Sequence, residues 1–253
     1  MKAIILAGGQ GKRFGIAQKI LPKSLVPIGG TPILKAVIED FAQNPEVDEV
    51  IILAGGNRRI RNFANWTRFK KPVAVLNVDK GVFGDLLSVR DKIGNQPFII
   101  GNADNLVLAR LPTKEQFEKS NAWMVTAVTR IKKPGEFTGI EFEGETVTRV
   151  DEKTRTSQTD FGVVGKKMLS PEVMDFIATQ SFPRNSGIGA LTQRLFETGK
   201  KIVPIIVPRE NIIHVTNFSD WWKHSKRYDS LRAAWIATKS RIPKRKPRRP
   251  YKR

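Results

Sequence analysis

The sequence predicts an α/β fold: a Rossmann-like three-layer α/β/α arrangement with a mixed, mostly parallel central sheet and a small β insertion. Short apolar runs alternate with helix-like stretches through the first 130 residues, as in a parallel sheet that is covered on both faces. The strand-and-turn string IILAGG occurs twice, at residues 4–9 and 51–56. From about residue 137 the pattern changes to shorter strands of alternating polarity.

Five short runs are expected to form buried strands, because each is apolar or β-branched and is bounded by turn residues. They cover residues 3–7, 49–54, 73–78, 97–101 and 123–129. Helical spacing of apolar residues predicts helices over 33–43 and 85–93. These strands and helices account for the parallel part of the sheet and its covering layers.

The second half of the chain is expected to begin with a hairpin at 138–150 that turns at Glu143 and Gly144. A helix should start near Ser170 and Pro171, since proline is favoured in the first helical turn. Another helix-like segment covers 223–240. We expect this half to be an insertion that meets the first half at a cleft.

Length and composition favour one globular body, with a single domain over residues 1–235 of the 253. No apolar run approaches the roughly 20 residues that cross a bilayer, and the apolar N-terminal stretch is too short for the core of a signal peptide. We therefore expect a cytoplasmic protein without a transmembrane segment. The chain has no cysteine, which excludes disulfides, thiolate metal sites and cysteine nucleophiles.

The chain carries a formal net charge of +20, and residues 239–253 contribute nine Lys or Arg and no acid. This segment contains three prolines and no apolar face, so we expect a basic, disordered tail. Such a tail suits an anionic partner: nucleic acid, an anionic membrane surface or an acidic protein surface. Tyr251 is its one aromatic residue, which gives little support to base stacking, and a purely solubilising role is equally compatible.

Glycines that follow a buried strand can present backbone N–H groups to phosphate oxygens, and both copies of IILAGG meet that minimum. The first copy continues with Gly11 and the cations Lys12 and Arg13. It matches neither a dinucleotide fingerprint, which needs glycine where Phe14 stands, nor a P-loop, which needs Ser or Thr where Arg13 stands. A different kind of phosphate loop is therefore expected.

The second copy continues as NRRIRNF. At helical spacing, Ile60, Phe63 and Ala64 share one face while the arginines of the segment point elsewhere. Core packing with a solvated basic face is the favoured interpretation of this copy.

Two segments, LAGGQGKRFG (6–15) and LPKSLVPIGGTPIL (21–34), together resemble the N-terminal signature of the sugar-phosphate nucleotidyltransferases. Weaker similarities follow in the same order as in that family. They are GVFGDLL (81–87), FIIGNADNL (98–106) and VDEKT (150–154). The resemblance spans residues 2 to about 230.

The resemblance implies that a sugar-1-phosphate oxygen attacks the α-phosphate of a nucleoside triphosphate and releases pyrophosphate. Because the reacting centre concentrates negative charge, positioning and electrostatic stabilisation supply most of the catalysis in such a transfer. Arg13 is expected to grip the triphosphate, and Lys23 to hold the α-phosphate and the incoming phosphate together. The residues expected to bind the nucleotide are Leu6, Gly8, Gly9, Gly11, Lys12, Gly81 and Gly84.

Asp104 ends an apolar strand, at the sheet edge where open α/β proteins bind ligands. The resemblance makes it the first ligand of a Mg²⁺ ion; the alternative is a carboxylate that caps the next turn. The family has a second acid where this chain has His214, in NIIHVTNFSDWW. An imidazole binds metals but suits Mg²⁺ less than a carboxylate does. Asp220 is expected to be a charge at a helix N-terminus.

The small β insertion is expected to bind the sugar. By resemblance, Gly139 allows close approach of the sugar, Glu152 accepts hydrogen bonds from its hydroxyls, and Lys153 lies near its phosphate. Asp160 stands where the family often has Asn.

The leading hypothesis is a Mg²⁺-dependent enzyme that makes a nucleoside-diphosphate sugar from a nucleoside triphosphate and a sugar-1-phosphate. One alternative is the same transfer to a polyol phosphate or choline phosphate. Another is a non-catalytic relative that binds nucleic acid or a protein through its basic surface. The sequence specifies neither the base nor the sugar, and it contains no hexapeptide repeat that would impose a trimer.

Overall fold

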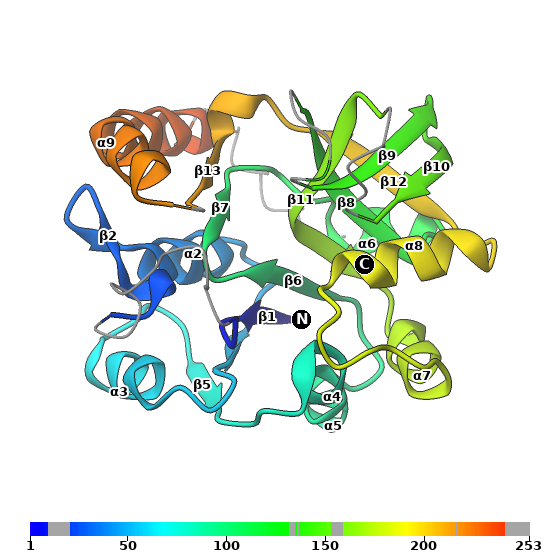
Figure 1. Ribbon diagram of the computed structural model, residues 1–253, viewed down its shortest axis with the longest axis horizontal. Coiled ribbons are helices and arrows are strands. Elements are labelled where there is room, and N and C mark those ends of the chain that lie inside the picture. Colours follow the sequence, from blue (N-terminus) through cyan, green and yellow to red (C-terminus); the bar gives the residue numbers. More distant parts are fainter. Residues whose placement is uncertain (10–20, 132–134, 136, 153–158, 216, 241–253) are drawn as a thin grey trace, which may run out of the picture.

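A nine-stranded mixed sheet forms the middle layer of the molecule, and helices cover both of its faces (Figure 1). The computed structural model describes residues 1–9, 21–131, 135, 137–152, 159–215 and 217–240. The expected α/β class with its mixed central sheet is confirmed. No helix in this described part is both long enough and apolar enough to cross a membrane.

Four of the expected strands form the parallel half of the sheet, in the order β5–β4–β1–β6. Their bounds are Lys2–Leu6 (β1), Glu49–Leu53 (β4), Val73–Leu76 (β5) and Phe98–Asn102 (β6). Leu6 at the end of β1 lies in register with Leu53 of β4 and Asn102 of β6. The segments that follow these strands therefore meet at one edge of the sheet.

The long strand β11 (Phe161–Leu169) joins the two halves of the chain into one sheet. Its second half pairs antiparallel with β6, and its first half pairs with β9 (Thr138–Glu143) of the hairpin β9–β10. A register irregularity between Val163 and Lys167 separates these two stretches along its other edge. The expected insertion is therefore a continuation of the main sheet.

The remaining strands extend or flank this sheet. The expected strand at 123–129 is β8 (Met124–Arg130), which pairs with β11 and, in parallel, with β12 (Ile202–Ile206). The other bounds are Thr146–Asp151 (β10), Asn105–Val107 (β7), Ile212–His214 (β13), Pro27–Ile28 (β2) and Thr31–Pro32 (β3). Antiparallel pairing of β7 with β13 brings a late segment of the chain beside the residues that follow β6.

Helices pack on two separate apolar clusters, one on each face of the sheet. Their bounds are Ile33–Ala42 (α2), Arg58–Trp66 (α3), Gly81–Leu87 (α4), Arg90–Ile93 (α5), Lys114–Lys119 (α6), Glu172–Thr179 (α7), Gly189–Glu197 (α8) and Phe218–Ser240 (α9). The helix expected at 85–93 is in fact two helices, α4 and α5. They are separated at Ser88, whose hydroxyl donates to the Gly84 carbonyl at 2.9 Å.

Helix α9 begins five residues before the expected start and covers the β2–β3 hairpin. Asn217 accepts a hydrogen bond from the Asp220 N–H (3.0 Å), which places Asp220 in the first turn of the helix, as expected. Tyr228 is buried, and the Trp221 indole N–H donates to the Pro27 carbonyl at 2.5 Å. The helix passes the expected domain boundary at residue 235, and most of the basic tail, residues 241–253, lies outside the described part.

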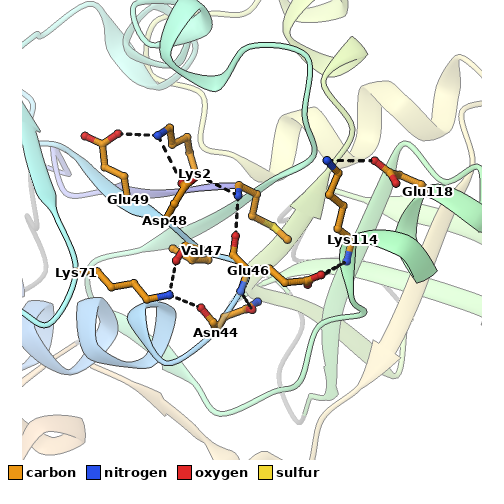
Figure 2. Close-up of polar contacts among 10 residues, drawn as sticks. Lys2, Asn44, Glu46, Val47, Asp48, Glu49, Lys71, Lys114 and Glu118 are labelled. Atoms are coloured by element: carbon orange, nitrogen blue, oxygen red, sulfur yellow. Dashed lines mark hydrogen bonds and ion pairs between the residues drawn. The ribbon is translucent and has the colours of Figure 1, made fainter. Parts of the chain in front are cut away.

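Figure 2 shows a polar network at the amino ends of β1 and β4, opposite the edge where these strands finish. The N-terminal ammonium group donates to the Glu46 carbonyl at 2.6 Å, and Lys2 pairs with Glu49 at 3.0 Å. Although burial alone would raise it, the pKa of Asp48 is lowered by the N-terminal charge and by Lys2. This network anchors the first residue of the chain and fixes where β1 starts.

The two IILAGG copies pack against each other through their glycines. Gly55 has a φ of +55°, and a Cβ added to it would lie 2.3 Å from the Gly8 Cα. In the other direction, a Cβ on Gly8 would lie 2.8 Å from the Gly55 Cα. The turns that follow β1 and β4 are therefore in backbone-to-backbone contact, which requires that both positions lack a side chain.

A buried ion pair ties β11 to α2. The Lys166 ammonium group lies 2.5 Å from Asp40 Oδ2, and it donates to the Ala109 carbonyl at 2.9 Å. Only 8% of the Lys166 side chain and 5% of the Asp40 side chain are exposed. Removing one partner alone would leave an uncompensated charge in the core.

Replacing Gly55 with alanine should lower the free energy of unfolding by about 1–3 kcal/mol, since the new methyl group overlaps the Gly8 backbone. Gly144→Ala is the matched control, because Gly144 has a similar φ of +58° but open space around it. Urea denaturation of both variants measures the difference. Equal losses would show that the close contact with Gly8 contributes nothing.

Lys166→Met should cost about 3–5 kcal/mol of stability, because it strands the Asp40 carboxylate in the core. The double variant Asp40→Leu/Lys166→Met removes both charges and should recover most of that loss. Denaturant unfolding of wild type, single and double variants gives the comparison. A double variant as unstable as the single one would contradict this account of the pair.

Candidate active site

A cavity of about 900 Å³ opens at the carboxyl ends of β1, β4 and β6. Its walls come from the glycine turns, the turn after β6, the first residues of α4, the bulged part of β11 and the segment before α8. Lining residues include Leu6, Gly8, Gly9, Lys23, Gly55, Asn57, Gly81, Asp85, Asn102, Asp104, Asn105, Thr138, Val163, Gly165, Lys167, residues 184–189 and His214. This is the sheet edge at which open α/β proteins bind ligands.

Lys23 and Asp104 form an ion pair inside this cavity. The Lys23 ammonium group lies 2.7 Å from Asp104 Oδ2, although the two residues are far apart in sequence. Lys23 starts a single 3₁₀ turn (Lys23–Leu25) after Pro22, and Asp104 stands between β6 and β7. The Lys23 side chain is 12% exposed and the Asp104 side chain is 32% exposed. An anionic ligand would therefore have access to the ammonium group, and a cation would have access to the carboxylate.

His214 lies beside this pair because β13 is paired with β7. It is opposite Asn105 in the ladder, and the next N–H, from Val215, donates to the Asp104 carbonyl at 3.4 Å. Burial lowers the pKa of His214 to about 4; Asp104 opposes this effect, and the Lys23 and Arg209 cations add to it. The imidazole is therefore neutral at pH 7.

The start of α4 forms one side of the cavity. Gly81 has a φ of +78°, and a Cβ on it would lie 2.8 Å from the Arg184 carbonyl oxygen. Asp85 accepts a hydrogen bond from the Lys80 N–H at 2.7 Å, and burial raises its pKa. Gly84 instead faces Lys80, whose Cβ would lie 2.6 Å from an added methyl group, and it is not among the lining residues.

Glu152 lies just behind the opposite wall. Its carboxylate accepts a hydrogen bond from the Thr138 hydroxyl at 2.6 Å. A Cβ on Gly189 would lie 2.2 Å from the same Glu152 oxygen. Thr138 and Gly189 line the cavity, and the Glu152 carboxylate lies against both without being a lining group itself.

Two other expected sugar-binding residues, Gly139 and Asp160, are not among the residues that line the cavity. Gly139 is buried within the sheet, where it pairs with Asp151 on β10 and Gly162 on β11. Asp160 is exposed just before β11. Among the expected site residues, Gly11, Lys12, Arg13 and Lys153 lie outside the described part of the chain.

Several lining residues were not identified from the sequence. Gly55 and Asn57 belong to the second IILAGG copy, and parallel pairing of β1 with β4 is what brings them to the cavity. The arginines of that copy are exposed and Ile60 is buried, which confirms the packing interpreted for α3. The segment 184–189 carries two glycines before a helix, a signal that could have indicated a ligand-binding turn.

Lys167 was also missed, because the sequence pattern does not show on which face of the strand a lysine within an apolar run lies. It is 2% exposed and lies on the opposite face of β11 from Lys166. Its ammonium group donates to the Val164 carbonyl at 3.4 Å. The register irregularity of β11 places it at the cavity wall.

Comparison with known proteins agrees with this geometry. The family model described as nucleotidyl transferase matches residues 2–230. UTP–glucose-1-phosphate uridylyltransferase of Staphylococcus haemolyticus is 25% identical over 216 residues, which cover 71% of this chain and 75% of that protein. Glucose-1-phosphate thymidylyltransferase of Streptomyces griseus is 25% identical over 214 residues, which cover 82% of this chain and 60% of that protein.

A solved structure gives the same result for the fold. The inositol-1-phosphate CTP transferase from T. maritima superposes with a TM-score of 0.70, at 15% identity, over 91% of this chain and 94% of that one. The family model spans most of the chain, and the glycine turns line a large cavity at the sheet edge: the chain belongs to the nucleotidyl transferase family, among relatives of the sugar-1-phosphate nucleotidylyltransferases.

Proposed function

We propose that the protein transfers a nucleoside monophosphate from a nucleoside triphosphate to a sugar-1-phosphate and releases pyrophosphate. The observation that carries this proposal is the Lys23–Asp104 pair, which lies in the cavity beside the glycine turns. The catalytic unit would be residues 1–235, acting in the cytoplasm.

The two substrates would lie in different parts of the cavity. The nucleotide would lie against the turn at Gly8 and Gly9 and the start of α4 at Gly81, which line the cavity. Exposed backbone N–H groups in glycine turns bind phosphate oxygens. The acceptor would lie on the other side, against Thr138 of β9 and the bulged stretch of β11.

Lys23 is the cation best placed for the reacting phosphates. In the transfer, the acceptor phosphate oxygen forms a bond to the α-phosphorus while the bond to pyrophosphate breaks. Both substrates are anionic, so a partly buried ammonium group reduces their repulsion and stabilises charge on the α-phosphate. Lys23 would exchange its contact with Asp104 for contact with phosphate oxygens.

A divalent cation would bind at Asp104 once Lys23 has moved to phosphate. Mg²⁺ takes oxygen ligands and commonly uses one or two carboxylates together with substrate phosphates, so the single carboxylate fits it. When bound, the ion neutralises phosphate charge. His214 is the second candidate ligand, since its neutral imidazole lines the same cavity. The described residues contain no cluster of three or more His, Asp or Glu ligands, so substrate and water would complete the coordination.

A second acceptor class is a polyol phosphate. Inositol-1-phosphate, the substrate in the name of the superposed CTP transferase, is the runner-up acceptor. A catalytically silent relative is the third candidate, because His214 replaces an expected acid.

Pyrophosphate release tests the proposal directly. The protein is incubated with Mg²⁺ and each common nucleoside triphosphate against a panel of sugar-1-phosphates, inositol-1-phosphate and choline phosphate. Release that needs one triphosphate and one acceptor would establish the transfer and name both substrates. Silence over the panel with retained triphosphate binding would instead support a binding protein.

Lys23→Ala and Asp104→Asn should each lower turnover by roughly 10²–10³-fold, since the first removes a cation from the reacting phosphates and the second weakens the proposed Mg²⁺ site. Lys35→Ala is the control, because Lys35 forms a surface pair with Glu39 at 3.6 Å. Initial rates and thermal unfolding are measured together. Near-normal rates in correctly folded Lys23 or Asp104 variants would contradict the assigned roles.

His214→Asp should preserve or improve the use of Mg²⁺, because a carboxylate suits this ion better than an imidazole does. The rate is measured as a function of Mg²⁺ concentration in the wild type and the variant. A lower Mg²⁺ requirement in the His214 variant alone would support metal ligation at this position. Unfolding of that variant would show that the histidine is structural.

A further inference from the structure

A 29-residue stretch, from Val50 to Val78, contains six basic residues and no acid. It includes β4, α3 and β5, at one end of the sheet (Figure 1). The apolar face of α3 is turned inward, through Ile60 and Ala64. The outward face and the turn after the helix carry the charge.

The exposed part of this stretch has two unusual properties. Trp66, at the end of α3, is 85% exposed, more than any other large hydrophobic side chain in the described part. Around it in the chain are the exposed cations Arg58, Arg61, Arg68 and Lys70. None of these four forms an ion pair with a described residue.

Other cationic side chains on the surface of the molecule form ion pairs with acidic residues. Lys119 pairs with Glu115 at 2.8 Å, Arg194 pairs with Glu197 at 3.1 Å, and Arg90 pairs with Asp175. The absence of acid on and after α3 is therefore local. A surface with several uncompensated cations attracts a polyanion and releases counterions when it binds one.

We propose that α3 and the turn after it, residues 58–70, form a binding surface for single-stranded nucleic acid. In this interaction Trp66 stacks on a base, and the four cations contact backbone phosphates. Three of them are arginines, whose planar guanidinium groups bind phosphate in a bidentate manner. No residue of 58–70 lines the cavity that holds the Lys23–Asp104 pair, so the proposal does not depend on the proposed function.

The same residues argue against a membrane as the partner. A helix that lies in a membrane interface buries a continuous apolar face in the lipid. The apolar face of α3 already packs on the core, and the outward side chains near Trp66 include Asn62 and Asn65, which are polar. One tryptophan alone provides little apolar area for insertion.

Binding is measured by fluorescence anisotropy of a labelled oligonucleotide of roughly ten nucleotides. Four phosphate contacts predict that log K falls with log salt with a slope of about −3. Arg58→Ser/Arg61→Ser/Arg68→Ser should reduce that slope by about 2. Trp66→Ala should weaken binding roughly 5- to 150-fold, because the stacking contact is lost. The oligonucleotide should also quench less of the protein's tryptophan fluorescence in this variant than in the wild type.

Two controls separate this surface from the overall charge of the chain. Arg90→Ser/Lys119→Ser/Arg194→Ser removes the same number of charges elsewhere, and Trp222→Ala removes the 54% exposed tryptophan of α9. All variants keep the basic tail. The proposal fails if both triple variants lose binding equally, if Trp66→Ala binds as wild type does, or if no oligonucleotide binds. It also fails if Trp66 is needed for anionic vesicles but not for the oligonucleotide.

Discussion

The close contact between Gly8 and Gly55 is the constraint on which the candidate site depends. Strands β1 and β4 are neighbours in parallel register, so the turns that follow them have to share the same small space at the sheet edge. They can do so because neither glycine has a side chain. The repeated IILAGG string is thus explained physically: one turn faces the cavity, and the second supports it and contributes part of the wall.

Two lysine–aspartate ion pairs of the structure differ in how deeply they are buried. Lys23 and Asp104 form a partly buried pair within the cavity, where either partner can be exchanged for a ligand. Lys166 and Asp40 form a more deeply buried pair on the other face of β11. Because β11 alternates its side chains between faces, consecutive lysines serve different surroundings: Lys166 holds α2, and Lys167 borders the cavity.

Much of this fold could be predicted from the sequence, because apolar runs bounded by glycine and proline mark the parallel strands directly. The expected helix at 85–93 was wrong in its extent, because α4 ends at Leu87 and α5 begins at Arg90. At this break the Ser88 hydroxyl and N–H both donate to the Gly84 carbonyl. The strands β7, β11, β12 and β13 were missed. These strands are short, or they contain lysine or proline, so they lack a clear strand pattern in the sequence. Pairing with strands that are distant in the sequence stabilises them.

The site was predicted unevenly for the same reason. Gly8 and Lys23 were found through the two-part signature, Asp104 through the weaker similarity at 98–106, and His214 through its place in the segment NIIHVTNFSDWW. The structure brings all four to one cavity. Glu152 was found too, but a tertiary contact with Thr138 and Gly189 determines where its carboxylate lies. Asn57 and the segment before α8 depend on which strands are neighbours, and one sequence does not contain that information.

Amide chemical shifts recorded during titration with a nucleoside triphosphate test the central claim most directly. If the paired glycine turns form the phosphate site, the backbone N–H signals of Gly8, Gly9 and Gly55 should shift most and saturate together. The Gly144 signal, from a glycine turn outside the cavity, should stay in place. Saturable binding that leaves the three turn glycines unshifted would contradict the account.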